Sequence, residues 1–343
     1  MRIGVLTGGG DCPGLNPAIR AIVYRGIDFA DEIIGIPLGW KGMLEGEGKE
    51  LNLKDVEEII SQGGTILGTS RTNPYKMEGG PQKVLDSLLS LKLDALIAIG
   101  GEDTLGVASR LYGDFKVRVV GVPKTMDNDL SETDFTFGFD TASTTSMEAL
   151  ERLRDTAKSH RRIMVLEVMG RHAGWVALYT ALGGGADAVL LPEVPVNLEE
   201  LSKSILKHHQ RKGYGLVVVS EGIEITATTD SAQNEVDSFG HIILGKRAAG
   251  AYIAKELEKR TKLETRSVQI GHIQRGGPPT LFDRVLGTLV GIKAIDLVHE
   301  EKFGYMASYK DGKVTEVPLE AATKEIKKVY ATWLKLLPVL FKK

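Results

Sequence analysis

The stretch VGVPKTMDND at residues 120–129 decides the first expectation for the fold. It is apolar up to Pro123 and then carries a lysine, a threonine and two aspartates. A short run that is apolar on both faces is typical of a strand in a parallel sheet covered by helices. Ligands bind to such sheets beyond the carboxyl ends of the strands, so the polar half of this stretch is predicted to border a binding crevice.

Similar apolar runs alternate with longer helical patterns along the chain, which predicts an α/β fold. The predicted strands are 2–6, 32–37, 95–100, 117–123, 162–168, 188–193, 215–222 and 267–271. The predicted helices are 16–30, 54–61, 81–92, 104–112, 140–159, 198–212, 245–260 and 281–300. A chain of 343 residues exceeds what one simple core usually holds, so two lobes are expected. The most polar stretch, residues 224–241, is expected to be a surface loop.

The composition argues against several classes of protein. A formal net charge of −2 gives no overall attraction to nucleic acid or to an anionic membrane, so we expect neither as a partner. The single cysteine, Cys12, excludes an internal disulfide and fits a reducing compartment. The sequence shows no signal peptide and no run of about 18 apolar residues, so a cytoplasmic location is expected.

Glycine, arginine and carboxylate residues recur where the predicted strands end. The segments are TGGGDCPG (7–14), GTSRTN (68–73), GGEDT (100–104), PKTMDND (123–129), VMGRHAG (168–174), SEG (220–222) and GHIQRGG (271–277). Because the carboxyl ends of parallel strands share one edge of a sheet, these segments are predicted to gather around one site.

The residue types in these segments suit phosphoryl transfer. Glycines 8–10 let backbone N–H groups approach a phosphate, and Glu102 is a hard oxygen ligand of the kind that Mg²⁺ prefers. Lys124 and Thr125 offer a cation and a hydroxyl, and Asp127 and Asp129 offer carboxylates for proton transfer and orientation. Five arginines, at positions 71, 162, 171, 266 and 275, fall in or beside these segments.

Taken singly, each of these residues also has an ordinary structural interpretation. A glycine turn can serve the chain alone, and a carboxylate at a helix start can be stabilised by the helix dipole. Each arginine alone can be a surface residue or an ion-pair partner, and His172 and His272 can be structural. The segments lack zinc-ligand spacing and a G-x-S-x-G nucleophile motif, so hydrolysis by those routes is disfavoured.

Taken together, these motifs resemble the 6-phosphofructokinases in order and spacing, from residue 3 to about residue 296. The resemblance implies a two-lobed fold in which each lobe is a mostly parallel sheet flanked by helices. It assigns residues 1–139 plus 274–323 to a phosphoryl-donor lobe and residues 140–273 plus 324–343 to a fructose 6-phosphate lobe. The implied enzyme is a homo-oligomer, either a dimer or a tetramer.

The resemblance also implies a role for each motif residue. Asp127 would be the base that deprotonates the 1-hydroxyl of the sugar, with Thr125 and Asp129 beside it, and Arg171 and Lys124 would complete the catalytic group. Gly10 and Arg71 would face the donor phosphates, and Glu102 would help to hold Mg²⁺. The sugar-phosphate site would comprise Met169, Gly170, Arg171, Glu221, His272 and Arg275, with Arg162 and Arg266 supplied across a subunit interface.

Two residues bear on the phosphoryl donor. ATP-dependent members of the family usually carry glycine where this chain has Asp103 and Lys124, whereas members similar to the pyrophosphate-dependent enzymes carry an aspartate and a lysine. A carboxylate and an ammonium group there would oppose the α-phosphate of a nucleotide and suit pyrophosphate. The sequence therefore favours pyrophosphate, with an ATP-dependent phosphofructokinase as the alternative. A non-catalytic sugar-phosphate or nucleotide sensor is the alternative of another class. Glu102 stands where many relatives have aspartate, which leaves open a contact with the metal through water.

Overall fold

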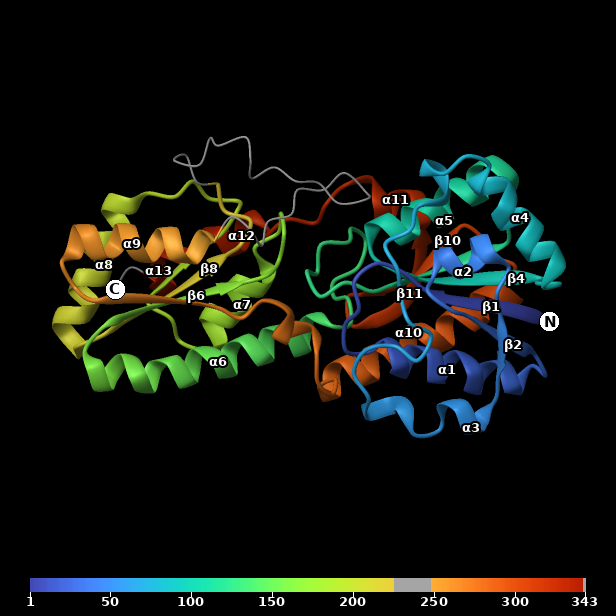
Figure 1. The fold of residues 1–343 in the computed structure, drawn as a ribbon, viewed down its shortest axis with the longest axis horizontal. Coiled ribbons are helices and arrows are strands. Elements are labelled where there is room, and N and C mark those ends of the chain that lie inside the picture. Colours follow the sequence, from blue (N-terminus) through green and yellow to red (C-terminus); the bar gives the residue numbers. More distant parts are fainter. Residues whose placement is uncertain (225–247, 342–343) are drawn as a thin grey trace.

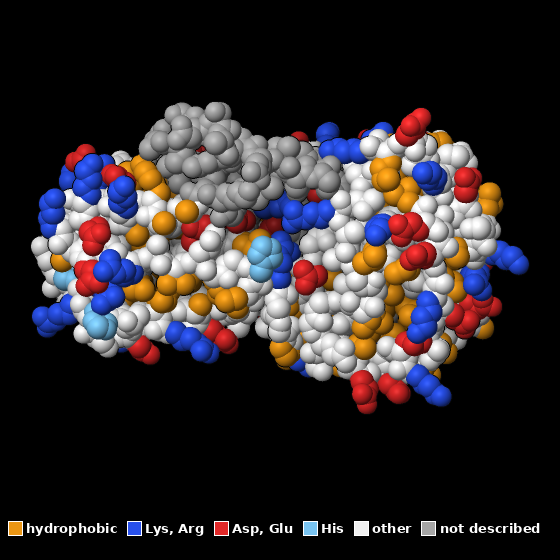
Figure 2. All heavy atoms as spheres, in the orientation of Figure 1, with side chains coloured by type: hydrophobic (Ala, Val, Ile, Leu, Met, Phe, Trp, Pro, Cys, Tyr) orange, Lys and Arg blue, Asp and Glu red, His pale blue; other side chains and the backbone are white. Residues whose placement is uncertain are grey.

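The computed structural model describes residues 1–224 and 248–341, and its strands form two sheets that lie at opposite ends of an elongated molecule (Figure 1). Figure 2 shows the surface of the molecule in the same orientation. The seven-stranded sheet has the order β11-β10-β5-β4-β1-β2-β3, and the four-stranded sheet has the order β7-β8-β6-β9. The first sheet contains β1 (Arg2–Thr7), β2 (Glu32–Ile36), β3 (Lys49–Leu51), β4 (Ala95–Gly100), β5 (Val119–Pro123), β10 (Tyr305–Lys310) and β11 (Lys313–Pro318). The second contains β6 (Ile163–Val168), β7 (Ala188–Leu190), β8 (Gly215–Ser220) and β9 (Thr265–Gln269).

Helices cover both faces of the first sheet, which explains why its central strands are apolar throughout. One face packs against α1 (Leu15–Asp28), α3 (Leu53–Val56) and α10 (Leu281–His299), and α1 lies directly beside α10. The other face packs against α2 (Trp40–Glu45), α4 (Gly80–Ser90), α5 (Glu102–Phe115) and α11 (Leu319–Lys324), as Figure 1 shows.

The second sheet is covered in the same way. One face packs against α6 (Phe139–His160), α7 (Trp175–Gly183) and the C-terminal helices α12 (Ala331–Leu334) and α13 (Leu337–Phe341). The other face packs against α8 (Leu198–Lys212) and α9 (Ala249–Thr261). Two apolar layers thus enclose each sheet, and the α/β fold expected from the sequence is confirmed.

Most of the predicted elements lie within two residues of the observed ones, and the larger differences have local causes. The expected helix 54–61 is a short α3 followed by a 3-10 turn, Ile59–Ser61. β7 ends at Leu190 instead of 193, two residues before Pro192, which cannot donate to a ladder. β9 begins at Thr265 because it is an edge strand paired only with β6, so its polar residues are tolerated on its exposed faces.

Several short elements were not expected from the sequence. The hairpin of β10 and β11, the strand β3 and the helices α2, α7, α11, α12 and α13 carry weak periodic patterns or are too short to show one. The polar segment 224–241 lies almost wholly outside the described residues, as does the first part of the expected helix 245–260. Among the described helices, none combines the length and apolarity needed to cross a membrane.

The parallel order of β1, β4 and β5 positions the candidate site. These three neighbouring strands run in the same direction and end at Thr7, Gly100 and Pro123. The residues that follow each of them therefore meet at one edge of the first sheet. In the second sheet, β6, β8 and β9 are also parallel neighbours, so Met169, Glu221 and Gly271 follow strand ends at one edge as well.

Candidate active site

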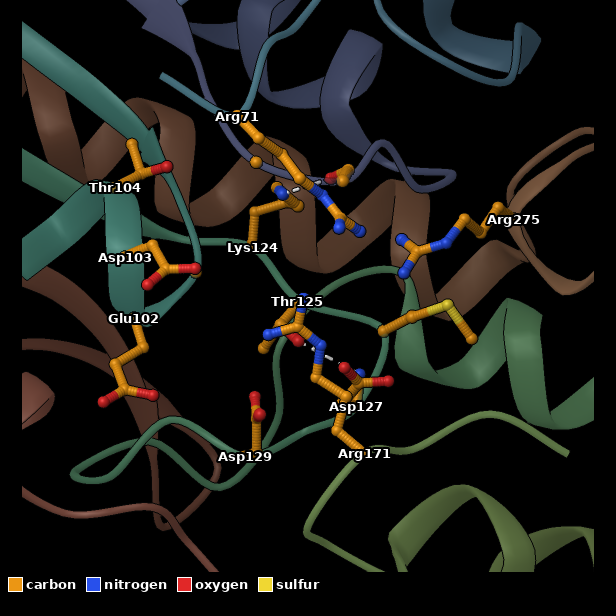
Figure 3. A pocket seen from close by; sticks show the side chains of 14 residues that line it. Arg71, Glu102, Asp103, Thr104, Lys124, Thr125, Asp127, Asp129, Arg171 and Arg275 are labelled. Carbon is orange, nitrogen blue, oxygen red and sulfur yellow. Dashed lines mark hydrogen bonds between the residues drawn. The ribbon is translucent and has the colours of Figure 1, made fainter. Parts of the chain in front are cut away.

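A polar pocket lies between the two lobes and brings together loops that are far apart in the sequence (Figure 3). It takes residues from the ends of β1, β4 and β5, from the loop that contains Arg71, and from the two loops that follow β6 and β9 of the second sheet. The lining residues are Gly9, Gly10, Arg71, Gly101, Glu102, Asp103, Thr104, Lys124, Thr125, Met126, Asp127, Asp129, Arg171 and Arg275. The site thus combines cations that suit phosphate with carboxylates that suit proton transfer.

Lys124 is the buried cation of the pocket. Its side chain is 3% exposed, and its Nζ donates a hydrogen bond to the Gly10 carbonyl oxygen. Burial lowers the pKa of Lys124, and the nearby Arg275 lowers it further. A buried ammonium group with a fixed partner is held in place when a phosphoryl donor enters the pocket. Its positive charge can therefore stabilise the negative charge of the bound phosphates.

Gly10 allows the guanidinium group of Arg275 to lie close to the β1 loop. A Cβ on Gly10 would lie 2.5 Å from Arg275 NH1, so any side chain there would displace the guanidinium. Arg275 is held in addition by a hydrogen bond from NH1 to the Asp11 carbonyl oxygen, at 2.9 Å. Glycine at position 10 therefore lets the β1 loop lie directly against the guanidinium group of Arg275, in the loop after β9.

The turn after β5 holds the catalytic candidates through its own hydrogen bonds. The Asp127 backbone N–H donates to Thr125 Oγ1 at 3.1 Å, and Thr136 Oγ1 donates to the Thr125 carbonyl oxygen at 2.6 Å. Asn128 has a left-handed backbone conformation, with φ 51°, and its Oδ1 accepts from the Thr136 backbone N–H at 3.1 Å. The turn is a fixed scaffold that presents Asp127 and Asp129 to the pocket (Figure 3).

Asp127 has the features of a general base. It is 6% exposed, and its Oδ1 has no hydrogen-bond partner among the described residues. Arg171 lies beside it in Figure 3. An unpartnered, buried carboxylate oxygen that faces a pocket is ready to accept a proton from a bound hydroxyl. Burial, together with the negative charge of Asp127, raises the pKa of Asp129 above its usual range.

The second lobe contributes a strained loop after β6. Arg171 has φ 47° and donates its backbone N–H to Glu221 Oε1 at 3.3 Å. A Cβ on Gly222 would overlap the Arg171 carbonyl oxygen, so the glycine allows the loops after β6 and β8 to touch. Burial, with a smaller contribution from the charge of Asp127, raises the pKa of Glu221 to about 7. Gly170, with φ 144°, also needs the freedom of glycine.

Other predicted sugar-site residues lie at the same edge but outside the pocket lining. The Met169 backbone N–H donates to the Oε1 of Gln274, a fully buried side chain, at 3.1 Å. His272 is exposed on the turn Gly271–Arg275 that follows β9. No sequence motif predicts a role for Gln274, although the residue joins the loops after β6 and β9.

Arg162 and Arg266 do not reach the pocket of their own chain. They stand at the amino ends of β6 and β9, a strand length away from the edge that carries Arg171. Glu264 lies between them, with its Oε1 3.5 Å from Arg162 NH1 and 2.9 Å from Arg266 NH2. The structure therefore does not bring these two arginines together with the other predicted site residues.

The carboxylates of the pocket suit a metal that is held partly by substrate. No group of three or more histidine, cysteine, aspartate or glutamate side chains with the geometry of a metal site occurs in residues 1–224 and 248–341. Mg²⁺ usually takes one or two protein carboxylates and completes its shell with water and phosphate oxygens. Glu102 at the start of α5 lines the same pocket as the phosphate-binding candidates, so the residues fit such an ion.

The fold and the pocket define a class of phosphoryl-transfer enzyme, and comparison with known proteins identifies the family. A family model described as "Phosphofructokinase" matches residues 2–298, and the chain belongs to this family. It is 52% identical over 95% of its length to the pyrophosphate--fructose 6-phosphate 1-phosphotransferase of Dictyoglomus thermophilum, and the match covers 95% of that protein. It is 46% identical over 96% of its length to ATP-dependent 6-phosphofructokinase 3 of Streptomyces coelicolor, with 96% of that protein covered.

A solved structure has the same fold. Phosphofructokinase from Pichia pastoris in the T-state superposes with a TM-score of 0.82 at 30% identity over 94% of this chain. The match covers 35% of that longer chain, so this protein corresponds to about a third of it. The two-lobed architecture described here is therefore that of the family.

Proposed function

We propose that this chain transfers a phosphoryl group from pyrophosphate to the 1-hydroxyl of fructose 6-phosphate, giving fructose 1,6-bisphosphate and phosphate. The observation that carries the proposal is that Asp103 and Lys124 both line the pocket that also contains Gly10 and Arg71. The name of the relative at 52% identity supports this choice of donor. The reaction is reversible in this proposal because pyrophosphate and the sugar phosphate differ less in transfer potential than ATP and the sugar phosphate.

The two charged residues select the donor by opposite effects. Lys124 is buried and held at Gly10, so it stabilises charge on a short phosphate chain that ends there. Asp103 adds a carboxylate at the start of α5, where the longer phosphate chain of a nucleotide would continue. Like charges a few ångströms apart are strongly unfavourable when water is excluded, so ATP is disfavoured.

Asp127 is the general base of this proposal. Its unpartnered oxygen accepts the proton of the sugar 1-hydroxyl as that oxygen attacks the phosphorus. Thr125 and Asp129, which flank Asp127 on the same turn, orient the attacking group, and Arg171 balances the charge that develops. A positioned carboxylate base contributes about 10²–10⁴ in rate.

The sugar phosphate lies against the second lobe in this proposal. Guanidinium groups bind phosphate through paired hydrogen bonds, which suits Arg171 and Arg275 on the two loops that border the pocket. Glu221 accepts from a sugar hydroxyl, and the backbone at Met169 and Gly170 shapes the ring site. His272 contacts the substrate from the turn after β9.

The metal of the proposal is Mg²⁺, held by Glu102 directly or through water. When bound, it neutralises charge on the transferring phosphoryl group. The protein supplies the rest: Gly10 and Arg71 hold the donor, and the turn after β5 excludes water from the reacting oxygen.

The assembly is a homo-oligomer in this proposal, because Arg162 and Arg266 must come from a second subunit to reach a sugar phosphate. The donor lobe comprises residues 1–139 plus 274–323, and the sugar lobe comprises residues 140–273 plus 324–343. We place the enzyme in the cytoplasm.

Initial rates with fructose 6-phosphate and Mg²⁺ test the donor, with pyrophosphate and ATP offered in parallel at matched concentrations. Turnover with pyrophosphate alone is expected. Turnover with ATP alone would favour the second candidate, the ATP-dependent reaction that the relative at 46% identity is named for. No turnover with either donor, together with tight sugar-phosphate binding, would favour a non-catalytic sensor.

Asp127→Ser tests the base. It should abolish turnover while leaving fructose 6-phosphate binding measurable by calorimetry. Asp86→Ser, at an exposed position of α4, is the matched control and should leave both unchanged.

A further inference from the structure

The segment 325–330 crosses from the first lobe to the second and lies against the catalytic turn (Figure 1). On the first-lobe side, the Lys327 backbone N–H donates to the Asp129 carbonyl oxygen at 2.7 Å. Ser131 Oγ donates to the Glu325 carbonyl oxygen at 2.7 Å, and Leu130 forms an antiparallel bridge with Ile326. Residues 325–327 therefore pair with residues 129–131 of the turn over a short antiparallel stretch.

The same segment is fixed to the second lobe by its other side. Trp175 Nε1, at the start of α7, donates to the Lys327 carbonyl oxygen at 2.9 Å. The Val329 backbone N–H donates to Glu193 Oε1 at 2.9 Å, and the same oxygen accepts from the Gly174 backbone N–H at 2.9 Å. Lys327 therefore stands where both lobes meet behind the carboxylates of the pocket.

The side chain of Lys327 ends inside the catalytic turn. It is 6% exposed, and its Nζ donates to Asn128 Oδ1 at 2.9 Å, to the Thr133 carbonyl oxygen at 2.8 Å and to the Asp134 carbonyl oxygen at 3.0 Å. All three donors of the ammonium group are used. Without them, three buried acceptors would lose a partner around Asn128, the residue whose left-handed backbone shapes the turn.

We propose that Lys327 is a positioning residue for phosphoryl transfer, whose ammonium group holds the 128–134 turn in the conformation that aims Asp127 and Asp129 into the pocket. Its main chain makes that conformation depend on contact with the second lobe. The inference deepens the proposed function and rests on it. Lys327 does not line the pocket, so it acts only through the turn.

The charge of this group gives the positioning role a distinct pH signature. Burial lowers the pKa of Lys327 to about 8, while Asp129 and Asp134 oppose that shift. Glu193 accepts a hydrogen bond from the segment, and Glu325, Lys328 and Tyr330 are titratable groups within it. The ammonium group lies 5.9 Å from the centre of the Trp175 ring. Above pH 8 the amine keeps only two donors for three acceptors, so kcat should fall as pH rises through about 8.

The contribution of Lys327 to stability has the opposite pH dependence to this decline. Because the pKa of Lys327 is lower in the folded state than its ordinary 10.5, the unfolded chain binds more protons between about pH 8 and pH 10.5. The contribution of this lysine to the free energy of unfolding therefore rises with pH across that window. A falling kcat with steady or rising stability would separate positioning from a purely structural role.

The experiment compares Lys327→Met and Lys327→Arg with the wild type, with Lys328→Met, at the exposed neighbouring position, as the control. We expect Lys327→Met to lower kcat by about 10- to 100-fold, the effect of displacing a reacting group by about 1 Å, with KM for fructose 6-phosphate changed less than about threefold. Lys327→Arg should restore part of kcat and move the alkaline decline to higher pH, because guanidinium stays protonated. Lys328→Met should match the wild type.

Each outcome bears on the proposal. Wild-type kcat in folded Lys327→Met would overturn it, and so would an alkaline limb that Lys327→Arg leaves in place. If Lys327→Met does not fold, Lys327→Arg and the wild-type pH profile decide alone. Wild-type turnover with pyrophosphate is measured first in the same assay: its absence refutes the donor assignment, and the series is then run with ATP. Absence of turnover with both donors refutes the proposed function and the positioning role with it.

Discussion

Replacing Lys124 with methionine separates catalysis from stability in this fold. Methionine has nearly the same length, so it fills the volume of a side chain that is 3% exposed, but it removes the ammonium group that donates to the Gly10 carbonyl oxygen. The catalytic loss should be that of one preorganised donor in a site without water, about 10²–10³ in kcat with pyrophosphate. KM for fructose 6-phosphate should change little, because Lys124 belongs to the donor end of the pocket.

Although Lys124→Met should lower kcat, it should not lower the stability of the protein. Leaving the Gly10 carbonyl oxygen unpaired costs about 1–3 kcal/mol. Removing a buried charge relieves a desolvation penalty of several kcal/mol, the same effect that lowers the pKa of Lys124. The two contributions oppose each other, so the free energy of unfolding should be unchanged or slightly raised.

Two measurements decide the matter: the initial rate of fructose 1,6-bisphosphate formation and the unfolding temperature by calorimetry. Lys83→Met, at an exposed position of α4, is the matched control and should change neither. A kcat within threefold of the wild type would refute the charge-stabilising role of Lys124. A large fall in unfolding temperature together with lost sugar-phosphate binding would show that the residue mainly supports the fold.

Three further predictions concern the choice of phosphoryl donor, the protonation of Glu221 and the close contact between Gly222 and the Arg171 carbonyl oxygen. Asp103→Gly combined with Lys124→Gly should create turnover with ATP and reduce turnover with pyrophosphate; unchanged donor preference in initial rates would contradict our account of both charges. Burial raises the pKa of Glu221 to about 7 from its ordinary 4.5. The folded state therefore binds more protons than the unfolded state in this pH range, and the contribution of Glu221 to the free energy of unfolding falls as the pH rises from about 4.5 to 7. Glu221→Gln should therefore raise the free energy of unfolding at pH 8 by up to about 3 kcal/mol, but not at pH 4, in urea titrations; equal effects at both pH values would speak against a buried carboxylate. Gly222→Ala should displace Arg171 and raise KM for fructose 6-phosphate far more than KM for pyrophosphate, and equal changes in both constants would argue against a local effect.

Much of the site could be predicted from the sequence because its residues follow strands. Apolar runs mark β1, β4 and β5, and the carboxyl ends of parallel neighbours share one edge. Gly10, Asp103 and Asp127 therefore had to lie near one another. The role of Asp103 and Lys124 in donor choice comes from the family resemblance. No local sequence pattern shows whether such a pair favours pyrophosphate or ATP.

Other parts of the site depend on contacts that no local pattern carries. Lys327 and Asn128 are 199 residues apart in the sequence. The residues that flank a single lysine in the sequence do not predict whether its side chain is buried or exposed. Gln274 stands 105 residues from the Met169 backbone that it accepts from. The segment 325–330 has neither a helical nor a strand period, because its role is to bridge two lobes and not to form a layer.

The charges of the site form one coupled set. Asp127 raises the pKa of both Asp129 and Glu221, whereas Arg171 lowers that of Asp129, and Asp129 in turn raises the pKa of Lys327. A proton gained at one of these groups therefore changes the affinity of the next group for a proton. A bell-shaped pH profile of kcat would then report apparent pKa values of the set and not of Asp127 alone. For this reason, the alkaline limb is assigned by substituting Lys327, whose charge lies outside the pocket, and not by substituting the base, which would remove the activity being measured.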